Sequence, residues 1–110
     1  MRIRKDRSAY EDQSGIDYEL IATVSDALAH PVRLRLFRYI MQMNREMKSV
    51  CTKDLVAEFN YAQATISQHM KKLVRSGLVE TKKEEKFAYY YVNLGVLAHY
   101  IEAAKRFSVL

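Results

Sequence analysis

The sequence predicts a mainly α-helical domain that carries one small β-hairpin. Three observations support this fold class: apolar residues recur at spacings of three and four over most of the chain, one stretch alternates apolar and polar residues, and 49% of the 110 residues are hydrophobic. Amphipathic helices give the first pattern and half-buried strands give the second. A chain of this length and composition is expected to form one domain around a single core.

The first two predicted helices meet at a proline. Apolar residues line one face of the first helix, which begins near Asp17: Leu20, Ile21, Val24, Ala27 and Leu28. Pro31 suits the first position of the second helix, where its missing N–H is not needed, and it biases His30 away from helical geometry. The second helix is expected to turn inward Val32, Leu36, Ile40 and Met43, while Arg33, Arg35 and Arg38 project elsewhere.

A short helix, a tight turn and a further helix are predicted in residues 52–75. The short helix TKDLVAEF has Thr52 or Ser49 as its N-cap, and Asn60 closes it because Asn tolerates the left-handed conformation. After a turn at residues 60–62, the helix 62–75 stops at Gly77. Its buried face is expected to consist of Ile66, Met70, Leu73 and Val74. Two short helices joined by such a turn are typical of a helix-turn-helix.

Small polar side chains lie on the other face of the helix 62–75. On a helical wheel, the side opposite the core carries Ala64, Thr65, Gln68, Lys71 and Lys72. Gln63 and Ser67 lie at the first turns. Gln bonds an adenine edge through two groups, Ser and Thr bond a base or a phosphate, and Lys pairs with phosphate. We therefore expect this helix to enter a major groove of DNA. An ordinary solvated helix also turns polar residues outward, but it explains neither the tight turn nor the basic excess.

A hairpin and a last helix complete the predicted fold. The strands are expected at residues 78–82 and 87–93, joined by a charged turn at 83–86. Lys82, Lys83 and Lys86 would then contact a minor groove or the DNA backbone, although Glu84 and Glu85 at the tip oppose this. At least one of the three tyrosines at 89–91 is expected to pack inward. A terminal helix over residues 94–110 has more apolar surface than so small a chain covers. The fold class is thus a winged helix-turn-helix of five helices and a two-stranded wing.

Charge and composition narrow the function. The net charge is +5 and the pI about 9.4, so the partner is expected to be anionic. Residues 1–15 form a basic polar arm ahead of a single domain at 16–110. No apolar run approaches the roughly 20 residues of a membrane span, and the first residues have no signal-peptide core, so a cytoplasmic protein without membrane contact is expected.

Three stretches resemble the ArsR/SmtB family of winged-helix repressors: ALAHPVRLRLFRYI, KDLVAEFNYAQATISQHMKKLVRSGLV and YYYVN. The resemblance spans roughly residues 16–107. It implies a symmetric homodimer that binds an inverted-repeat operator in double-stranded DNA, with half-sites about 34 Å apart. The DNA-reading positions would be Gln63, Ala64, Ser67 and Gln68. The dimer surface would include Leu20, Val24, Leu97, Ile101 and Ala104.

The sequence also departs from that family. Ala62 stands at the helix N-cap, where Ser is usual, and Asn60 replaces the glycine of the turn. The family's metal-ligand sets are missing: Lys53 occupies the second thiolate position, and no acid and histidine precede His99 and Glu102 at the required distance. We therefore expect neither a metal nor another cofactor, and the sequence leaves the effector open.

Three further hypotheses about function follow from the sequence. Cys51 is a candidate redox switch, because a helix N-terminus and Lys53 would stabilise its thiolate. Catalysis is not expected: Ser67 and His69 point about 200° apart on one helix, and the chain has no glycine-rich phosphate loop. The alternative to a DNA-binding regulator is a winged-helix module that binds an acidic protein, which the acidic hairpin tip leaves open.

Overall fold

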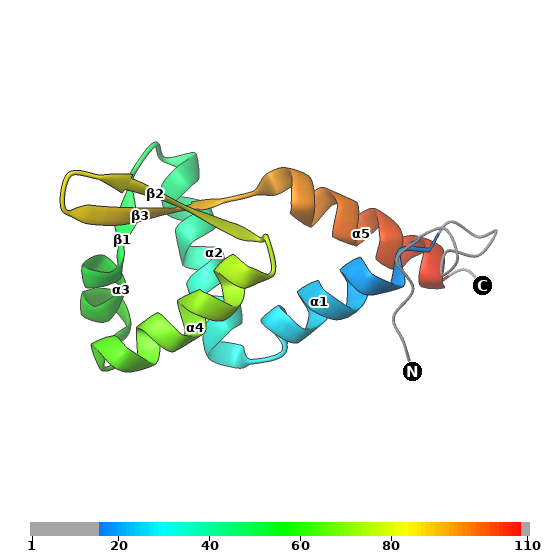
Figure 1. The fold of residues 1–110 in the computed structure, drawn as a ribbon, viewed down its shortest axis with the longest axis horizontal. Coiled ribbons are helices and arrows are strands. Elements are labelled where there is room, and N and C mark those ends of the chain that lie inside the picture. Colours follow the sequence, from blue (N-terminus) through cyan, green and yellow to red (C-terminus); the bar gives the residue numbers. More distant parts are fainter. Residues whose placement is uncertain (1–15, 109–110) are drawn as a thin grey trace.

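The computed structural model describes residues 16–108, and the predicted arm at 1–15 lies outside them. In the described part five helices and three strands form (Figure 1). The helices are α1 Tyr18–Leu28, α2 Pro31–Arg45, α3 Thr52–Phe59, α4 Gln63–Arg75 and α5 Leu94–Ser108. The strands are β1 Val50–Cys51, β2 Val79–Glu84 and β3 Phe87–Val92. The predicted winged helix-turn-helix is therefore confirmed.

Local signals place most helix ends. Asp17 caps α1, since its carboxylate accepts a hydrogen bond from the Leu20 N–H. His30 is extended and Pro31 opens α2, as predicted. The expected N-cap of α3 was wrong: Cys51 takes this position instead of Thr52 or Ser49, and the Asp54 carboxylate accepts a hydrogen bond from the Cys51 N–H at 2.9 Å.

The sheet has three strands instead of the predicted two. It is antiparallel with the order β1-β3-β2, and Val50 pairs with Tyr90 while Glu84 pairs with Phe87. The strand β1 was missed because two residues cannot show an alternating pattern. The hairpin turn is also shorter than predicted, since Lys83 lies within β2 opposite Ala88.

The helices and the inner face of the sheet enclose one hydrophobic core. Its fully buried side chains include Val24, Leu36, Ile40, Leu55, Ile66, Met70, Leu73 and Leu78. Ile66, Met70 and Leu73 confirm the predicted inner face of α4, whereas Val74 is half-buried. Tyr90 is the tyrosine that packs inward, and its hydroxyl lies 2.9 Å from Thr52 Oγ1. Burial of each large apolar side chain contributes about 1.5–3 kcal/mol, so this core holds α4 in place.

Different helices and strands form the two ends of the molecule. At one end α5 packs along α1, and Ser25 Oγ lies 3.1 Å from Tyr100 Oη between them (Figure 1). At the other end lie α3, the start of α4 and the hairpin of β2 and β3. No helix within residues 16–108 has both the length and the apolar character to cross a bilayer.

Candidate nucleic-acid interface

The turn between α3 and α4 exposes the beginning of α4. Asn60 has φ 57° and ψ 39°, the left-handed conformation that was predicted, and its N–H donates to the Val56 carbonyl at 3.0 Å. Ala62 is extended and serves as the N-cap of α4 without a side-chain hydrogen bond. The helix α4 therefore begins at a sharp corner, and its first N–H groups have no side-chain cap.

The side chains predicted to read DNA lie together on the outside of α4. The exposed ones are Gln63, Ala64, Thr65, Ser67, Gln68 and Lys71. Within residues 16–108 none of the polar ones among them forms a side-chain hydrogen bond or an ion pair. Their donors and acceptors are thus available to a ligand, and the small Ala64 and Ser67 permit close approach of a base-pair edge.

Lys72 differs from its neighbours on α4. Its ammonium lies 2.9 Å from Asp26 Oδ2 on α1, and its side chain is 40% exposed. The hydrogen bond from Lys72 and the charge of Lys72 lower the pKa of Asp26, with a smaller contribution from the charge of Arg33. The predicted phosphate contact of Lys72 would therefore compete with its ion pair to Asp26.

A concave pocket of about 430 Å³ separates the start of α4 from the hairpin. Lys53, Gln63 and Lys86 line it together with residues of α3 and β3. Lys53 was missed as a site residue because the sequence cannot reveal that the start of α3 faces the hairpin. Lys83 and Lys86 are both exposed on the hairpin, beside Glu84 and Glu85 at its tip.

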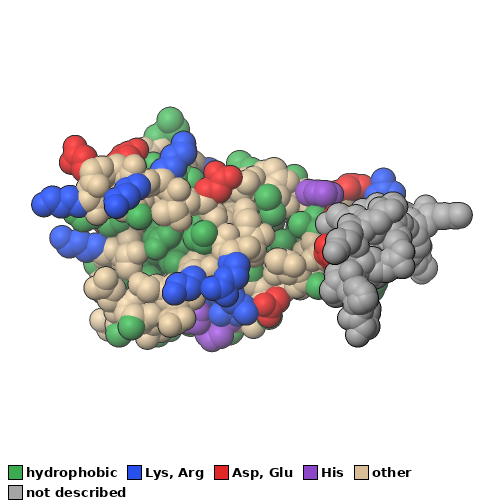
Figure 2. Space-filling model, viewed as in Figure 1, with side chains coloured by type: hydrophobic (Ala, Val, Ile, Leu, Met, Phe, Trp, Pro, Cys, Tyr) green, Lys and Arg blue, Asp and Glu red, His purple; other side chains and the backbone are tan. Residues whose placement is uncertain are grey.

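Positive charge gathers on the face of the molecule that carries the hairpin and α4. Figure 2 shows Lys and Arg side chains in one group over the hairpin and in another over α4, with acidic side chains at the hairpin tip. Basic side chains on the hairpin and on α4 itself give this face the positive charge expected of a surface that contacts a phosphate backbone.

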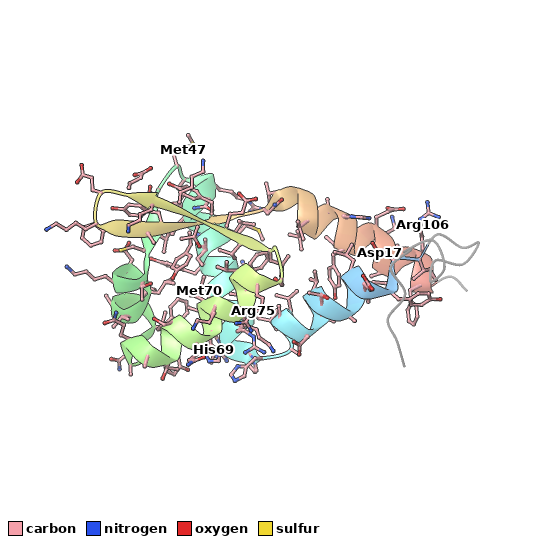
Figure 3. The ribbon with its side chains drawn as sticks, in the orientation of Figure 1. Asp17, Met47, His69, Met70, Arg75 and Arg106 are labelled. Carbon is pink, nitrogen blue, oxygen red and sulfur yellow. The ribbon has the colours of Figure 1, made fainter. Side chains whose placement is uncertain are left out.

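Behind the reading face, Arg33 connects three helices. Its Nε donates to the Ala27 carbonyl at 2.6 Å and its Nη2 to the Asp26 carbonyl at 3.3 Å, while its Nη1 lies 3.2 Å from His69 Nδ1 on α4. The His30 and His69 rings are 4.6 Å apart. Burial lowers the pKa of His69, and the charges of His30 and Arg33 lower it further. Figure 3 shows His69 beside the start of α2, whereas Met70 points into the core. The sequence indicated nothing of this arrangement, since Arg33 and His69 are 36 residues apart.

The predicted dimer surface is only partly exposed in the single chain. Ile101 is 50% exposed on α5, and the half-buried positions are Leu20, Leu97 and Ala104. Val24 is 0% exposed, so it supports the core of its own chain and cannot line a surface. Leu94 and Phe107, which the prediction left out, are also exposed on α5. Leu94 and Ile101, seven residues apart, thus share an apolar face of α5 that the described residues leave uncovered. The Phe107 ring instead lies edge-on to the Tyr18 ring of α1, with the centroids 6.5 Å apart.

The surroundings of Cys51 differ from those that a redox switch needs. The thiol is 8% exposed and donates a hydrogen bond to Asp54 Oδ2 at 3.4 Å. A buried thiol is shielded from oxidants in solution, and structural buried cysteines are unreactive. In the part of the chain that the structure describes, no three His, Cys, Asp or Glu side chains are grouped closely enough to hold a metal ion.

Comparisons with known proteins agree with this geometry. Residues 28–82 match the helix-turn-helix domain family. An HTH-type transcriptional regulator of Methanocaldococcus jannaschii is 32% identical over 75 residues, which are 68% of this chain and 80% of that protein. The arsenical resistance operon repressor of Staphylococcus xylosus is 31% identical over 78 residues, with 71% and 70% covered.

Solved structures share the fold. An ArsR-like transcriptional regulator from a Rhodococcus species superimposes with a TM-score of 0.73 at 20% identity, and 84% of this chain and 82% of that chain are covered. A homodimeric winged helix-turn-helix DNA-binding domain from Mycobacterium bovis gives a TM-score of 0.67 at 22% identity, with 94% and 87% covered. The three-stranded sheet and the five helices are therefore those of a known winged-helix architecture.

Proposed function

Because the chain belongs to the ArsR/SmtB family of winged helix-turn-helix transcriptional regulators, we propose that it is a homodimeric repressor that reads an inverted-repeat operator through α4. The observation that carries this proposal is the row of exposed polar side chains at the start of α4, which have no partner within residues 16–108. Side chains with unused donors and acceptors on a protruding helix are suited to base edges.

Different residues have different tasks in this proposal. Gln63 and Gln68 are the candidates for base contacts, because an amide offers a donor and an acceptor side by side. Thr65 and Ser67 bond a base or a phosphate, and Lys71 pairs with phosphate. On the hairpin and α3, Lys53, Lys83 and Lys86 contact the backbone next to the groove that α4 enters. Ala64 lets the helix approach closely.

The dimer is proposed from the uncovered face of α5. Leu94, Ile101 and Phe107 are between 50% and 59% exposed, which is unusual for three large apolar side chains on one helix of a small domain. A second copy that packs there, with Leu20, Leu97 and Ala104 at the same interface, would cover them. The homodimeric Mycobacterium bovis domain of the same fold supports this arrangement. Two reading helices would then enter successive major grooves about 34 Å apart.

Repression is proposed by analogy with the staphylococcal relatives, which are described as repressors of arsenical resistance operons. A repressor meets its operator in the compartment that holds the DNA, so the proposal also places the protein in the cytoplasm. It includes no catalytic step: His69 is engaged with Arg33, and Ser67 lies on another face of α4.

The proposal is tested by fluorescence anisotropy with duplexes recovered by selection from a random DNA library. Gln68→Ala should weaken binding of the selected duplex by about 1–3 kcal/mol and relax the base preference at one position of each half-site. The matched control is Gln42→Ala, which removes an exposed glutamine from α2. Equal affinity of the wild type for selected and scrambled duplexes would overturn the proposal.

The acidic tip of the hairpin favours a second candidate, a module that binds a protein. Glu84 and Glu85 are exposed there, beside Phe87, which is 43% exposed. Salt separates the two functions, because DNA affinity falls linearly with the logarithm of salt concentration as phosphate contacts release counterions. A protein module would show neither that steep dependence nor a preferred DNA sequence.

A further inference from the structure

We propose that Arg33 positions the reading helix α4, and that it holds this helix only while His69 is neutral, so that operator binding weakens as the pH falls below neutrality. This inference rests on the proposed DNA binding. Arg33 is a positioning residue here, since it lies behind the reading face and acts on DNA through α4.

One guanidinium group joins the three helices whose arrangement sets the direction of α4. Arg33 extends from α2 and donates two hydrogen bonds to the last carbonyls of α1, those of Asp26 and Ala27. The Asp26 carbonyl also accepts a hydrogen bond from the Ala29 N–H at 3.2 Å. The carbonyls at the end of a helix carry partial negative charge, so a cation at this end is stabilised. The remaining Nη1 reaches His69 on α4 at 3.2 Å. Because the guanidinium contacts both the end of α1 and the middle of α4, it has little conformational freedom.

The chemistry of this contact requires a neutral imidazole. A guanidinium stays charged at any physiological pH and has donors only. His69 Nδ1 must therefore accept the hydrogen bond, which assigns the proton of the neutral ring to Nε2. A second proton at Nδ1 would place two donors and two positive charges 3.2 Å apart. Protonation thus replaces an attraction between α2 and α4 by a repulsion.

The neighbouring charges do not relieve this repulsion. His30, at the start of α2, has its ring 4.6 Å from that of His69, and its Nδ1 accepts a hydrogen bond from the Val32 N–H. On α4 itself Lys72 adds another positive charge. The acidic side chain facing the cluster is Asp26 on α1, and its carboxylate is paired with Lys72 at 2.9 Å. Burial and the charges of His30 and Arg33 lower the pKa of His69, which agrees with a neutral ring near pH 7.

The positioning role of Arg33 predicts the direction in which the DNA affinity changes with pH. Gln68 and His69 are adjacent on α4, so a displacement of His69 from Arg33 moves a side chain that the proposed function assigns to the bases. Ordinary electrostatics predicts the opposite trend, because each protonated histidine adds positive charge and strengthens binding to phosphate. A loss of affinity at low pH therefore separates a positioning role from a general charge effect.

The first experiment measures the Kd for the selected duplex between about pH 5.5 and 7.5 at constant ionic strength, with circular dichroism to confirm folding. The wild type should bind about tenfold more weakly at the lower pH. His69→Asn supplies a non-titrating acceptor near the position of Nδ1, so it should bind like the wild type at the upper pH and lose the pH dependence. Arg33→Lys keeps the charge without the planar fork, and should bind more weakly throughout with a flatter profile.

Two controls locate the effect. His99→Asn changes an exposed histidine on α5 and should keep the wild-type profile. His30→Asn keeps a side chain that can cap α2. It should keep the loss of affinity at low pH but move it to a higher pH, because the charge of His30 no longer lowers the pKa of His69. The inference is overturned if the affinity rises as the pH falls, if His69→Asn keeps the wild-type profile, or if His30→Asn removes the loss of affinity at low pH. Absence of sequence-specific binding near pH 7.5 would instead overturn the proposed function.

A second measurement needs no DNA. The ¹⁵N chemical shifts of the labelled imidazoles should show His69 as the Nε2–H tautomer, and its titration midpoint should lie below the ordinary value of 6.5. An Nδ1–H tautomer in the neutral ring would contradict the contact with Arg33 directly. The tautomer and the titration of His69 are measured on the protein without DNA, so they test this inference independently of the proposed function.

Discussion

Lys72 Nζ on the reading helix lies 2.9 Å from Asp26 Oδ2 at the end of α1. The same lysine is one of the cations that DNA binding would direct to a phosphate. Because an exposed ion pair contributes little to stability, its main effect is expected on the ligand. In the proposed complex, Asp26 would therefore compete with DNA for the positive charge of Lys72.

Asp26→Asn should tighten DNA binding severalfold and steepen its salt dependence. Once Lys72 is released it can contact one more phosphate, and each such contact adds about 0.9 to the slope of log affinity against log salt. The backbone carbonyl that binds Arg33 is unchanged by this substitution. Anisotropy titrations over a range of salt concentrations measure the slope. Glu102→Gln, which removes the carboxylate paired with Arg106 on α5, is the control and should leave the slope unchanged; an unchanged slope for Asp26→Asn would show that Lys72 does not reach DNA.

Ala62→Ser should stabilise the protein by about 1 kcal/mol. Ala62 is the extended N-cap of α4 and has no side-chain hydrogen bond, so a hydroxyl would satisfy one of the first N–H groups. Urea unfolding measures the change. Ala22→Ser is the control, because it places the same side chain on the exposed face of α1, where serine lowers stability by a few tenths of a kcal/mol. A decrease for both variants would mean that the corner before α4 does not permit the capping geometry.

Leu73→Ala should destabilise the protein by about 2–5 kcal/mol. Leu73 is 0% exposed on the inner face of α4, so its truncation leaves a cavity that the core cannot fully close. The free energy of unfolding is compared with that of Leu34→Ala, which changes a leucine that is 49% exposed on α2. Similar losses for the two variants would contradict the packing of α4 against the core.

Stability should also depend on His69 near neutral pH. Its pKa is lowered on folding, so the unfolded chain binds the proton more readily than the folded one. This contribution is complete above the ordinary pKa of 6.5 and is lost as the pH falls from there through the lower folded value. The urea midpoint of the wild type should fall over this range more than that of His69→Asn. Parallel curves for the two proteins would contradict a proton-sensitive His69.

Ile101→Glu should convert the proposed dimer to monomers in analytical ultracentrifugation. Ile101 is 50% exposed on the uncovered face of α5, and a carboxylate buried there without a partner opposes association. His99→Glu is the control, because residues two apart on a helix point about 200° away from each other. Unchanged association of Ile101→Glu would place the dimer contact elsewhere.

Local patterns predicted the helices and the corner of the helix-turn-helix. Asn60 and Pro31 act through their own backbone preferences, which the sequence displays. The inner face of α4 followed in the same way from its periodicity. The strand β1 escaped because two residues carry no period.

Contacts between residues far apart in the sequence could not be predicted from local patterns. The pair Arg33 and His69, 36 residues apart, and the pair Asp26 and Lys72 depend on how α1, α2 and α4 pack. The helical period placed Val24 on the correct face of α1, but it could not distinguish a face that packs on the chain's own core from one that meets a second copy. The burial of Val24 shows that this residue packs on the core of its own chain. Leu97 is partly exposed, so its side chain is available to a dimer contact.

Selection of bound duplexes from a random DNA library, with the wild type and Gln68→Ala in parallel, tests the proposed DNA reading most directly. The wild type should enrich an inverted repeat whose half-sites are centred about 10 base pairs apart, and Gln68→Ala should lose the preference at one symmetric pair of positions. Enrichment of no sequence by the wild type, or of the same repeat with undiminished preference by Gln68→Ala, would contradict the assignment of α4 as the reading helix.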